Sequence, residues 1–263
     1  MTPRGLCYWV SYLQLSPSTF AAQCKAQGIT TVSFLRNFKG KFYCTKFEEY
    51  LPALRDAVIS WGTWCYPVPT QLDLVSELAG EAQALGASHF MVDCEDEWRN
   101  VAELVVPNLF AAIRNAYNGP VGYTMYGKVY AVKDSYPWKA FQEARPDFCV
   151  PQAYDTKNDQ GDAYQTTVVD SWRAYGFRDV QCGLSVVNQN SAEIQAKYAQ
   201  TPDDVPAVWW WEFSRANTED QETLSSLQPK PGFMTRPSEP GSASSWKGPL
   251  AVGTLLWFAS RYR

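Results

Sequence analysis

Residues 62–95 read GTWCYPVPTQLDLVSELAGEAQALGASHFMVDCE, and this stretch contains the pattern that decides the fold. Two apolar, β-rich runs, at 62–68 and 88–95, enclose a segment at 70–86 with helical spacing that stops at Gly86. A strand, a helix and a second strand in this order predict two parallel strands joined by a right-handed crossover. The stretch therefore predicts one β/α unit.

The same unit recurs along the rest of the chain. Further β-rich runs bring the total to eight, and they lie at 5–13, 29–36, 120–127, 147–155, 179–187 and 206–214. Helical patterns lie between them, and in the one at 99–119 we expect Pro107 to kink or interrupt the helix. Eight such units favour a single closed (β/α)8 TIM-like barrel of the α/β class over an open sheet. No GxGxxG motif follows the first run, which also disfavours a dinucleotide-binding fold.

The composition changes near residue 228. We expect the barrel to cover residues 1–227, a Pro-, Gly- and Ser-rich linker to cover 228–249, and a short hydrophobic tail to cover 250–263. The apolar run of the tail has about half of the ~20 residues that span a bilayer. Because aromatic and basic residues surround it, we expect residues 246–263 to attach the barrel to a membrane surface or a virion partner. The alternative is that the tail folds back onto the barrel.

Charge and cysteine content restrict the class of protein. The net charge is −4 without a basic block, so nucleic acid is not an expected partner. The seven cysteines form no CxxC pair and His89 is the single histidine, which predicts reduced thiols, no metal and no cofactor. The chain enters a strand almost at once, without a signal peptide of the usual form, so we expect a protein made in the cytoplasm. We also expect a monomer.

An acidic cluster ends the fourth predicted strand, in the sequence FMVDCEDEW at 90–98. Side chains alternate along a strand, so Asp93 and Glu95 share one face while Val92 and Cys94 suit the helix-facing side. Active sites of such barrels lie at the carboxyl ends of the strands. Asp93 and Glu95 are therefore predicted to be catalytic carboxyls at the barrel mouth, of the kind that glycoside hydrolysis uses.

The next two acids, Asp96 and Glu97, are assigned to a loop or first helical turn, where acids favour the helix dipole. Magnesium held by the carboxylates is the alternative to acid catalysis. Other strand ends carry polar and aromatic residues, which predicts a sugar-binding mouth with stacking faces and hydrogen-bond partners. These predicted substrate-binding residues are Tyr123, Tyr126, Gln152, Tyr154, Asp155, Trp211 and Glu212.

Several of these motifs resemble those of glycosidase barrels. The chain is similar to the glycoside hydrolase family 25 lysozymes, and more distantly to the family 18 chitinase-type barrels. Residues 9–14, WVSYLQ, match the first-strand motif of the lysozymes, with Trp9 in place of an aspartate. Residues 93–95, DCE, match their fourth-strand motif, and 211–214, WEFS, echo a later one. The segment at 152–155, QAYD, is closer to the chitinase type.

The resemblance implies a function for these positions. It gives Glu95 the role of general acid and Asp93 the supporting role, and it places Trp9 in the substrate-binding site. It further implies a peptidoglycan hydrolase for cell wall lysis, in the layout of phage endolysins and virion-associated lysins, with a polysaccharide substrate. Two other classes stay open, a non-catalytic carbohydrate-binding barrel and a structural virion protein.

Overall fold

The structure is a computed structural model, and it describes residues 2–127, 135–154, 164–187, 189–212 and 218–234. The predicted site residue Asp155 lies outside the described residues. The same is true of residues 235–263, which contain the predicted tail and most of the predicted linker.

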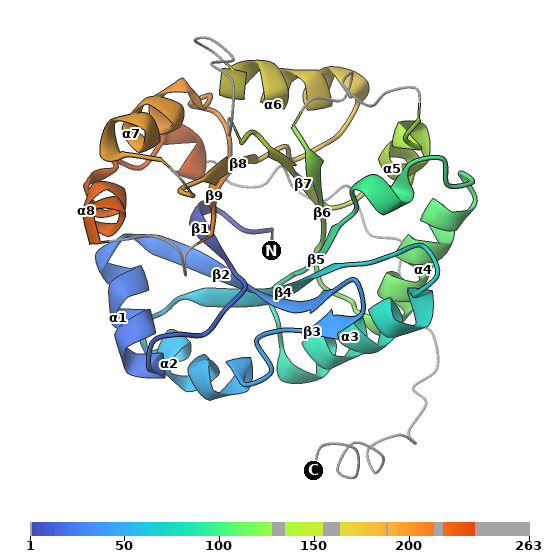
Figure 1. The fold of residues 1–263 in the computed structure, drawn as a ribbon, viewed down its shortest axis with the longest axis horizontal. Helices are drawn as coiled ribbons and strands as arrows, with labels where there is room; N and C mark the ends of the chain where they lie inside the picture. The colour runs from blue at the N-terminus through green and yellow to red at the C-terminus, as the bar shows by residue number, and fades with distance from the viewer. Residues whose placement is uncertain (1, 128–134, 155–163, 188, 213–217, 235–263) are drawn as a thin grey trace.

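Eight parallel strands close into a barrel, which confirms the predicted (β/α)8 fold (Figure 1). The strand β1 pairs with both β2 and β9 and so closes the sheet on itself. A two-residue strand, β3 (Lys41–Phe42), forms an antiparallel hairpin with the end of β2. The barrel strands are β1 (Gly5–Val10), β2 (Ile29–Phe38), β4 (Ser60–Tyr66), β5 (Phe90–Asp93), β6 (Val121–Tyr126), β7 (Phe148–Gln152), β8 (Cys182–Ser185) and β9 (Ala207–Trp211).

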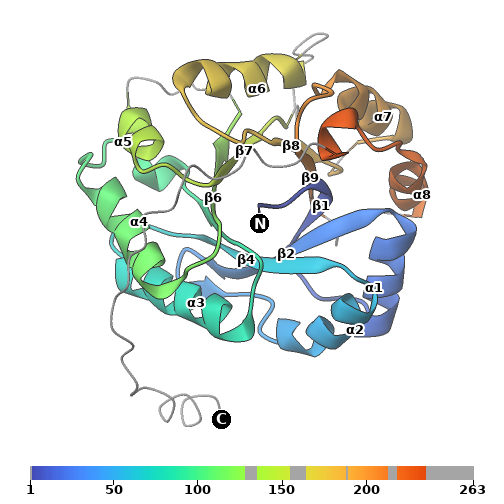
Figure 2. The ribbon, with the colours of Figure 1, turned by 180° about the vertical axis from the view of Figure 1, so that it is seen from behind.

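Helices form the outer ring, and the view from behind shows them around the barrel on all sides (Figure 2). In chain order they are α1 (Pro17–Ala26), α2 (Leu51–Asp56), α3 (Leu72–Leu85), α4 (Val105–Ala116), α5 (Trp138–Glu143), α6 (Tyr164–Tyr175), α7 (Ser191–Gln200) and α8 (Thr218–Ser226). This arrangement leaves the two ends of the barrel uncovered by helices. A site is expected at the end where the strands have their carboxyl termini.

Local sequence signals explain where some of the helices begin and end. The Ser16 side chain accepts the Thr19 N–H at 3.3 Å before α1, and Gly86 ends α3 at a φ of 77°. The prediction that Pro107 kinks or interrupts its helix was wrong. The helix α4 begins at Val105, so Pro107 lies in the first turn, where a missing N–H leaves no helical hydrogen bond unmade.

Side chains alternate between two cores, one inside the barrel and one between the sheet and the helices. In β5, Met91 belongs to the interior core, while Phe90 and Val92 belong to the helix-facing core. Cys94 continues the helix-facing side. This alternation directs the next interior position, Asp93, toward the barrel axis.

His89 lies inside the barrel and limits the size of the side chains that fit beside it. Its Nε2 is 3.0 Å from the Ser33 Oγ, and burial lowers its pKa to about 3, so the ring is neutral at pH 7. A Cβ atom on Gly62 would lie 2.3 Å from the His89 ring, much closer than van der Waals contact allows. The barrel interior is therefore closely packed around a neutral histidine.

We expect Gly62→Ala to lower the free energy of unfolding by ~1–3 kcal/mol, because the added methyl group overpacks the interior against His89. Urea denaturation followed by circular dichroism would measure it. Gly80→Ala is the matched control, since a Cβ in the middle of α3 meets its nearest neighbour at 4.0 Å. Alanine is also the better helix former, so the control should be neutral or stabilising. Equal losses in both variants would contradict the packing argument.

The first residues of the predicted linker pack against the barrel. Lys230 forms an ion pair with Asp203 at 3.0 Å, and the Gly232 N–H donates to the Asp203 carbonyl at 2.7 Å. A short helical turn, η5 (Pro231–Met234), follows. Residues 228–234 therefore continue the barrel. Among the residues that the structure describes, no helix is long and apolar enough to cross a membrane.

Candidate active site

Asp93 and Glu95 lie at the carboxyl end of β5. Asp93 is buried, and the Gln152 Nε2 at the end of β7 donates to its Oδ1 at 3.1 Å. The same amide nitrogen lies 3.5 Å from the Thr124 Oγ1 of β6. Glu95 follows the strand and is half-buried. Neighbouring strands therefore hold Asp93 in place, while Glu95 lies closer to the open mouth.

The surroundings of the two carboxyls favour their protonated forms. Burial raises the pKa of Asp93 well above its usual range, and the charge of Glu95 raises it further, while the Gln152 hydrogen bond opposes both effects. Burial also raises the pKa of Glu95, against hydrogen bonds from Gln152 and Asp93. The pair therefore retains a proton to higher pH than ordinary carboxyls do, as a general acid must.

Aromatic rings pack beneath this pair. The Trp9 ring stacks on Trp209 at 5.3 Å between centroids, and its Nε1–H donates to the Met91 Sδ at 3.4 Å. Trp9 was predicted to contact substrate, but the ring is only 2% exposed because interior side chains surround it. Trp9 is therefore part of the floor of the mouth. Trp211 packs edge-on against Trp9 at 6.5 Å and is half-buried, so it stays accessible from above.

Tyr154 and Glu212 complete one side of the mouth. Burial raises the pKa of Tyr154, and the charges of Asp93, Glu95 and Glu212 raise it further, so its hydroxyl stays a hydrogen-bond donor. The Glu212 Oε1 accepts the Ser11 N–H at 3.0 Å and thereby links the end of β9 to the loop after β1. Tyr154 is thus placed to donate to a ligand, whereas Glu212 holds the loop.

The two predicted tyrosines of β6 have different positions. Tyr126 ends the strand, is half-buried, and lies under the Arg99 guanidinium at 5.7 Å from its ring centroid. The expectation that Tyr123 faces the mouth is corrected, because its ring lies on the helix-facing side and stacks on Phe141 at 4.5 Å. Its hydroxyl is 2.9 Å from that of Tyr136. The alternation along β6 thus gives only Tyr126 access to the mouth.

A charged cluster beside the acids was not recognised as part of the mouth. Glu97 lies in a short helical turn, η2 (Asp96–Trp98), and its Oε2 accepts the Tyr66 hydroxyl at 2.5 Å. Glu97 also pairs with Lys39, whose Nζ lies 5.0 Å from the centroid of the Tyr66 ring. The assignment of Glu97 to a helical turn holds, but this turn belongs to the mouth. In the sequence, only the position of Tyr66 near the end of the β-rich run at 62–68 indicates this.

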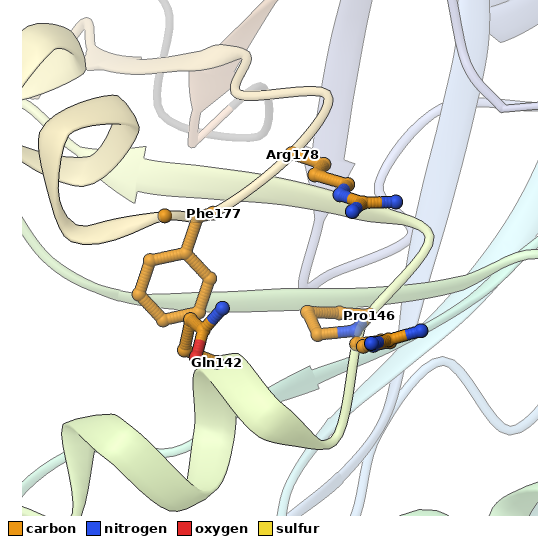
Figure 3. Close-up of a pocket in the computed structure, with 6 residues that line it drawn as sticks. Gln142, Pro146, Phe177 and Arg178 are labelled. Carbon is orange, nitrogen blue, oxygen red and sulfur yellow. The ribbon is translucent and has the colours of Figure 1, made fainter.

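Two cavities lie at the opposite end of the barrel. One, of about 90 Å³, lies between the connections that enter β7 and β8, where Gln142 and Phe177 line it together with Arg178 (Figure 3). The other, of about 380 Å³, is lined by residues just before β1, β4 and β5 and by the first residues of β2 and β4. Neither contains the strand-end acids, and the amino-terminal face of such barrels is associated with stability. In the described part of the chain, no three metal-ligating side chains converge on one point.

Comparisons with known proteins identify the fold. No family model and no curated protein sequence matches the chain. A GH18 chitinase from Pseudoalteromonas aurantia is 11% identical over 82% of this chain and 97% of its own, with a TM-score of 0.54. A GH113 β-mannanase from Alicyclobacillus acidocaldarius is 12% identical over 80% and 86%, with a TM-score of 0.55. A putative deoxyribose-phosphate aldolase from Toxoplasma gondii ME49 is 17% identical over 86% and 94%, with a TM-score of 0.55.

At these identities the likeness is one of fold alone. Glycosidases and an aldolase share the barrel, so the barrel by itself is compatible with more than one chemistry. The resemblance to family 25 lysozymes stays a prediction. The choice of chemistry therefore depends on the side chains at the mouth.

Proposed function

We propose that this protein is a glycoside hydrolase that cleaves an N-acetylated glycan, with Glu95 as general acid and Asp93 as the supporting carboxylate. The observation that carries the proposal is the carboxyl pair at the end of β5, whose raised pKa values leave it a proton to donate. The resemblance to lysozymes favours peptidoglycan as the glycan.

The proposed reaction begins with the transfer of a proton from Glu95 to the oxygen of the glycosidic bond. The bond between this oxygen and the anomeric carbon breaks, and positive charge develops on the sugar ring. Because the pair holds one shared proton and Glu95 has given it away, Asp93, which accepts a hydrogen bond from Gln152, carries the compensating negative charge. Tyr154 and Gln152 supply donors that suit the carbonyl oxygen of an acetamido group. Water finally adds to the anomeric carbon and gives one proton to the Glu95 carboxylate, which restores the acid.

The mouth favours this chemistry over that of a Schiff-base aldolase, which requires a lysine nucleophile. Of the described lysines at the mouth, Lys39 is ion-paired with Glu97, and Lys41 of β3 lies at the rim. The mouth also differs from a site that only binds sugar. Burial of two carboxyls that repel each other is costly, and sugar binding alone does not require it.

The test is product analysis with purified protein. Peptidoglycan, N-acetylglucosamine oligomers and β-mannan would each be incubated with the wild type, with Glu95→Gln and with Glu103→Gln, an exposed glutamate that serves as the control. Mass spectrometry should detect fragments with new reducing ends from an N-acetylated glycan, released by the wild type and the control alone. Cleavage of mannan alone would refute the N-acetylated substrate. Binding without cleavage of any glycan would favour the non-catalytic carbohydrate-binding alternative.

The tail proposal can be tested separately. We propose that residues 246–263 attach the barrel to a membrane surface or a larger assembly, because the run at 250–259 is apolar and has basic neighbours. Since residues 228–234 pack on the barrel, the truncation should follow residue 234. We expect the truncated protein to keep its melting temperature and activity but to lose sedimentation with anionic liposomes. A melting temperature lower by several degrees would instead show that the tail stabilises the barrel.

A further inference from the structure

Exposed aromatic rings gather at one side of the mouth. Tyr12, after β1, is 45% exposed, and Phe38, at the end of β2, is 37% exposed. Tyr43, just after β3, lies between them, with ring centroids 5.8 Å from Tyr12 and 6.5 Å from Phe38. We call Tyr12, Phe38 and Tyr43 the aromatic rim. Large exposed apolar side chains that are contiguous usually mark a binding surface.

The aromatic rim is continuous with the candidate active site. The Phe38 ring lies 4.6 Å from that of Tyr66, whose hydroxyl donates to Glu97. Tyr66 ends β4, which pairs with β5, and its partner Glu97 lies in the turn that directly follows Glu95, so this ring adjoins the strand end that carries the carboxyl pair. Tyr43 also packs against the core inside the barrel. A ligand bound at the acids therefore meets the rim next along this side of the mouth.

Buried and charged contacts hold the rim in position. Arg36 is buried, pairs with Glu81 of α3 at 2.8 Å, and donates to the carbonyl oxygens of Tyr43 and Cys44, each at 3.0 Å. At the tip of the hairpin, Lys39 pairs with Glu97. Because both ends of the hairpin are fixed, its rings are preorganised, which reduces the entropy that binding would cost.

We propose that the aromatic rim binds the sugar rings of a glycan chain beyond the bond that is cut, so that the protein acts on long chains in preference to short ones. This inference rests on the proposed glycosidase function. Rings that follow one another away from the acid pair suit a ligand that is itself a row of rings. Apolar faces with a few hydrogen-bonding groups among them are typical of small-molecule and sugar sites.

The charges in the rim favour a glycan over a protein partner. Lys39 lies 5.5 Å from the Phe38 ring centroid, and Lys41 lies 5.4 Å from that of Tyr43. Lysine is depleted in the cores of protein interfaces, since its charge must be desolvated there. In a sugar site the same ammonium groups stay in contact with water and can donate to hydroxyl or carboxylate oxygens. Two lysines among the rings therefore fit a hydrated polysaccharide.

The hairpin also supplies a matched control. Phe38 pairs with Lys41 in the antiparallel register, and Asn37 pairs with Phe42. Side chains on neighbouring strand positions point to opposite faces, so Phe42 lies on the face of the hairpin away from Phe38. Phe42 is 41% exposed, almost as Phe38 is. Alanine at Phe38 or at Phe42 thus removes an equally exposed phenyl ring, but only Phe38 belongs to the aromatic rim.

The experiment measures binding in a Glu95→Gln background, which the proposed mechanism leaves unable to cut its ligand. Tyr12→Ala, Phe38→Ala and Phe42→Ala would each be titrated calorimetrically with N-acetylglucosamine dimer and hexamer, and run in gels with soluble glycol chitin. We expect Tyr12→Ala and Phe38→Ala each to weaken hexamer binding about threefold to tenfold and to reduce the preference for hexamer over dimer. Phe42→Ala should match its parent.

Two results would overturn the rim proposal. One is that all three variants bind the hexamer as tightly as their parent. The other is that Phe42→Ala weakens hexamer binding as much as Tyr12→Ala and Phe38→Ala do, which would indicate a general effect on the hairpin. Melting temperatures of the variants identify a misfolded protein, and Phe38→Leu then repeats the test with an apolar side chain retained. The proposed function is tested separately, by the hydrolysis assay with the wild type. Rim-dependent binding by a wild type that cuts no glycan refutes the hydrolase but supports the rim, whereas hydrolysis with rim-independent binding does the reverse.

Discussion

Glu95→Gln should reduce glycan hydrolysis by roughly 10² to 10⁴-fold, because the amide cannot give a proton to the leaving oxygen. The substitution keeps the size and shape of the side chain, which is half-buried at the mouth. Its folding should therefore be unchanged. Initial rates of reducing-end release, measured with saturating substrate across a range of pH, would give the size of the effect.

The comparison with Glu103→Gln separates this effect from a general loss of negative charge, since Glu103 is exposed. The control should keep the wild-type rate. If Glu95→Gln retains more than about a tenth of the activity, another group supplies the proton and the assignment of Glu95 is wrong.

Asp93→Asn should lower the rate by about 10²-fold, because the buried carboxylate no longer balances the positive charge on the sugar ring. The alkaline limit of the remaining activity should also lie at a lower pH than in the wild type. In the wild type, the two carboxyls share a proton, and burial together with the charge of Glu95 beside Asp93 keeps it bound to a higher pH. In the variant only Glu95 can hold the proton, and its pKa is raised less far than that of Asp93, so the alkaline limit of the pH–rate profile moves down. An unchanged limit would show that the two carboxyls do not titrate together.

The same variant should be more stable than the wild type at neutral pH. The folded-state pKa of Asp93 lies above its unfolded-state value, so the folded protein binds more protons between these two values. Stability of the wild type therefore falls as the pH rises through this window, and Asp93→Asn removes that contribution. Urea denaturation at pH 5 and pH 8 should show a gain for the variant at pH 8 that shrinks at pH 5. A variant less stable at pH 8 would indicate that Asp93 is needed for packing.

The barrel could be predicted because its strands and helices have clear local signals. Buried parallel strands are continuous apolar runs, and Ser16 and Gly86 mark helix ends through their own backbone chemistry. The hairpin was not predicted, because β3 has only two residues and carries no periodic signal. Pro107 was misread because a proline disrupts a helix only after its first turn, and the sequence did not show where α4 begins.

The candidate site was predictable where it follows from alternation along a single strand. The period of two was sufficient to place Asp93 on the inner face. It did not place Tyr123, because a tyrosine is acceptable on either side of the sheet and here joins an aromatic cluster under the helices. The contact of Glu97 with Tyr66 and Lys39 joins segments from three strand ends. Contacts of this kind depend on the relative positions of strands, which local patterns do not specify.

The tryptophans around the barrel axis give the protein an optical probe at its own mouth. The Trp211 ring lies 5.6 Å from Trp64 and 6.5 Å from Trp9. Of the three, only Trp211 is partly open to solvent, whereas Trp9 and Trp64 are 2% exposed. A ligand that covers the mouth would therefore change the polarity around one indole and leave the other two as an internal reference. Emission from the unlabelled protein could then follow ligand binding in real time, without a chromogenic substrate.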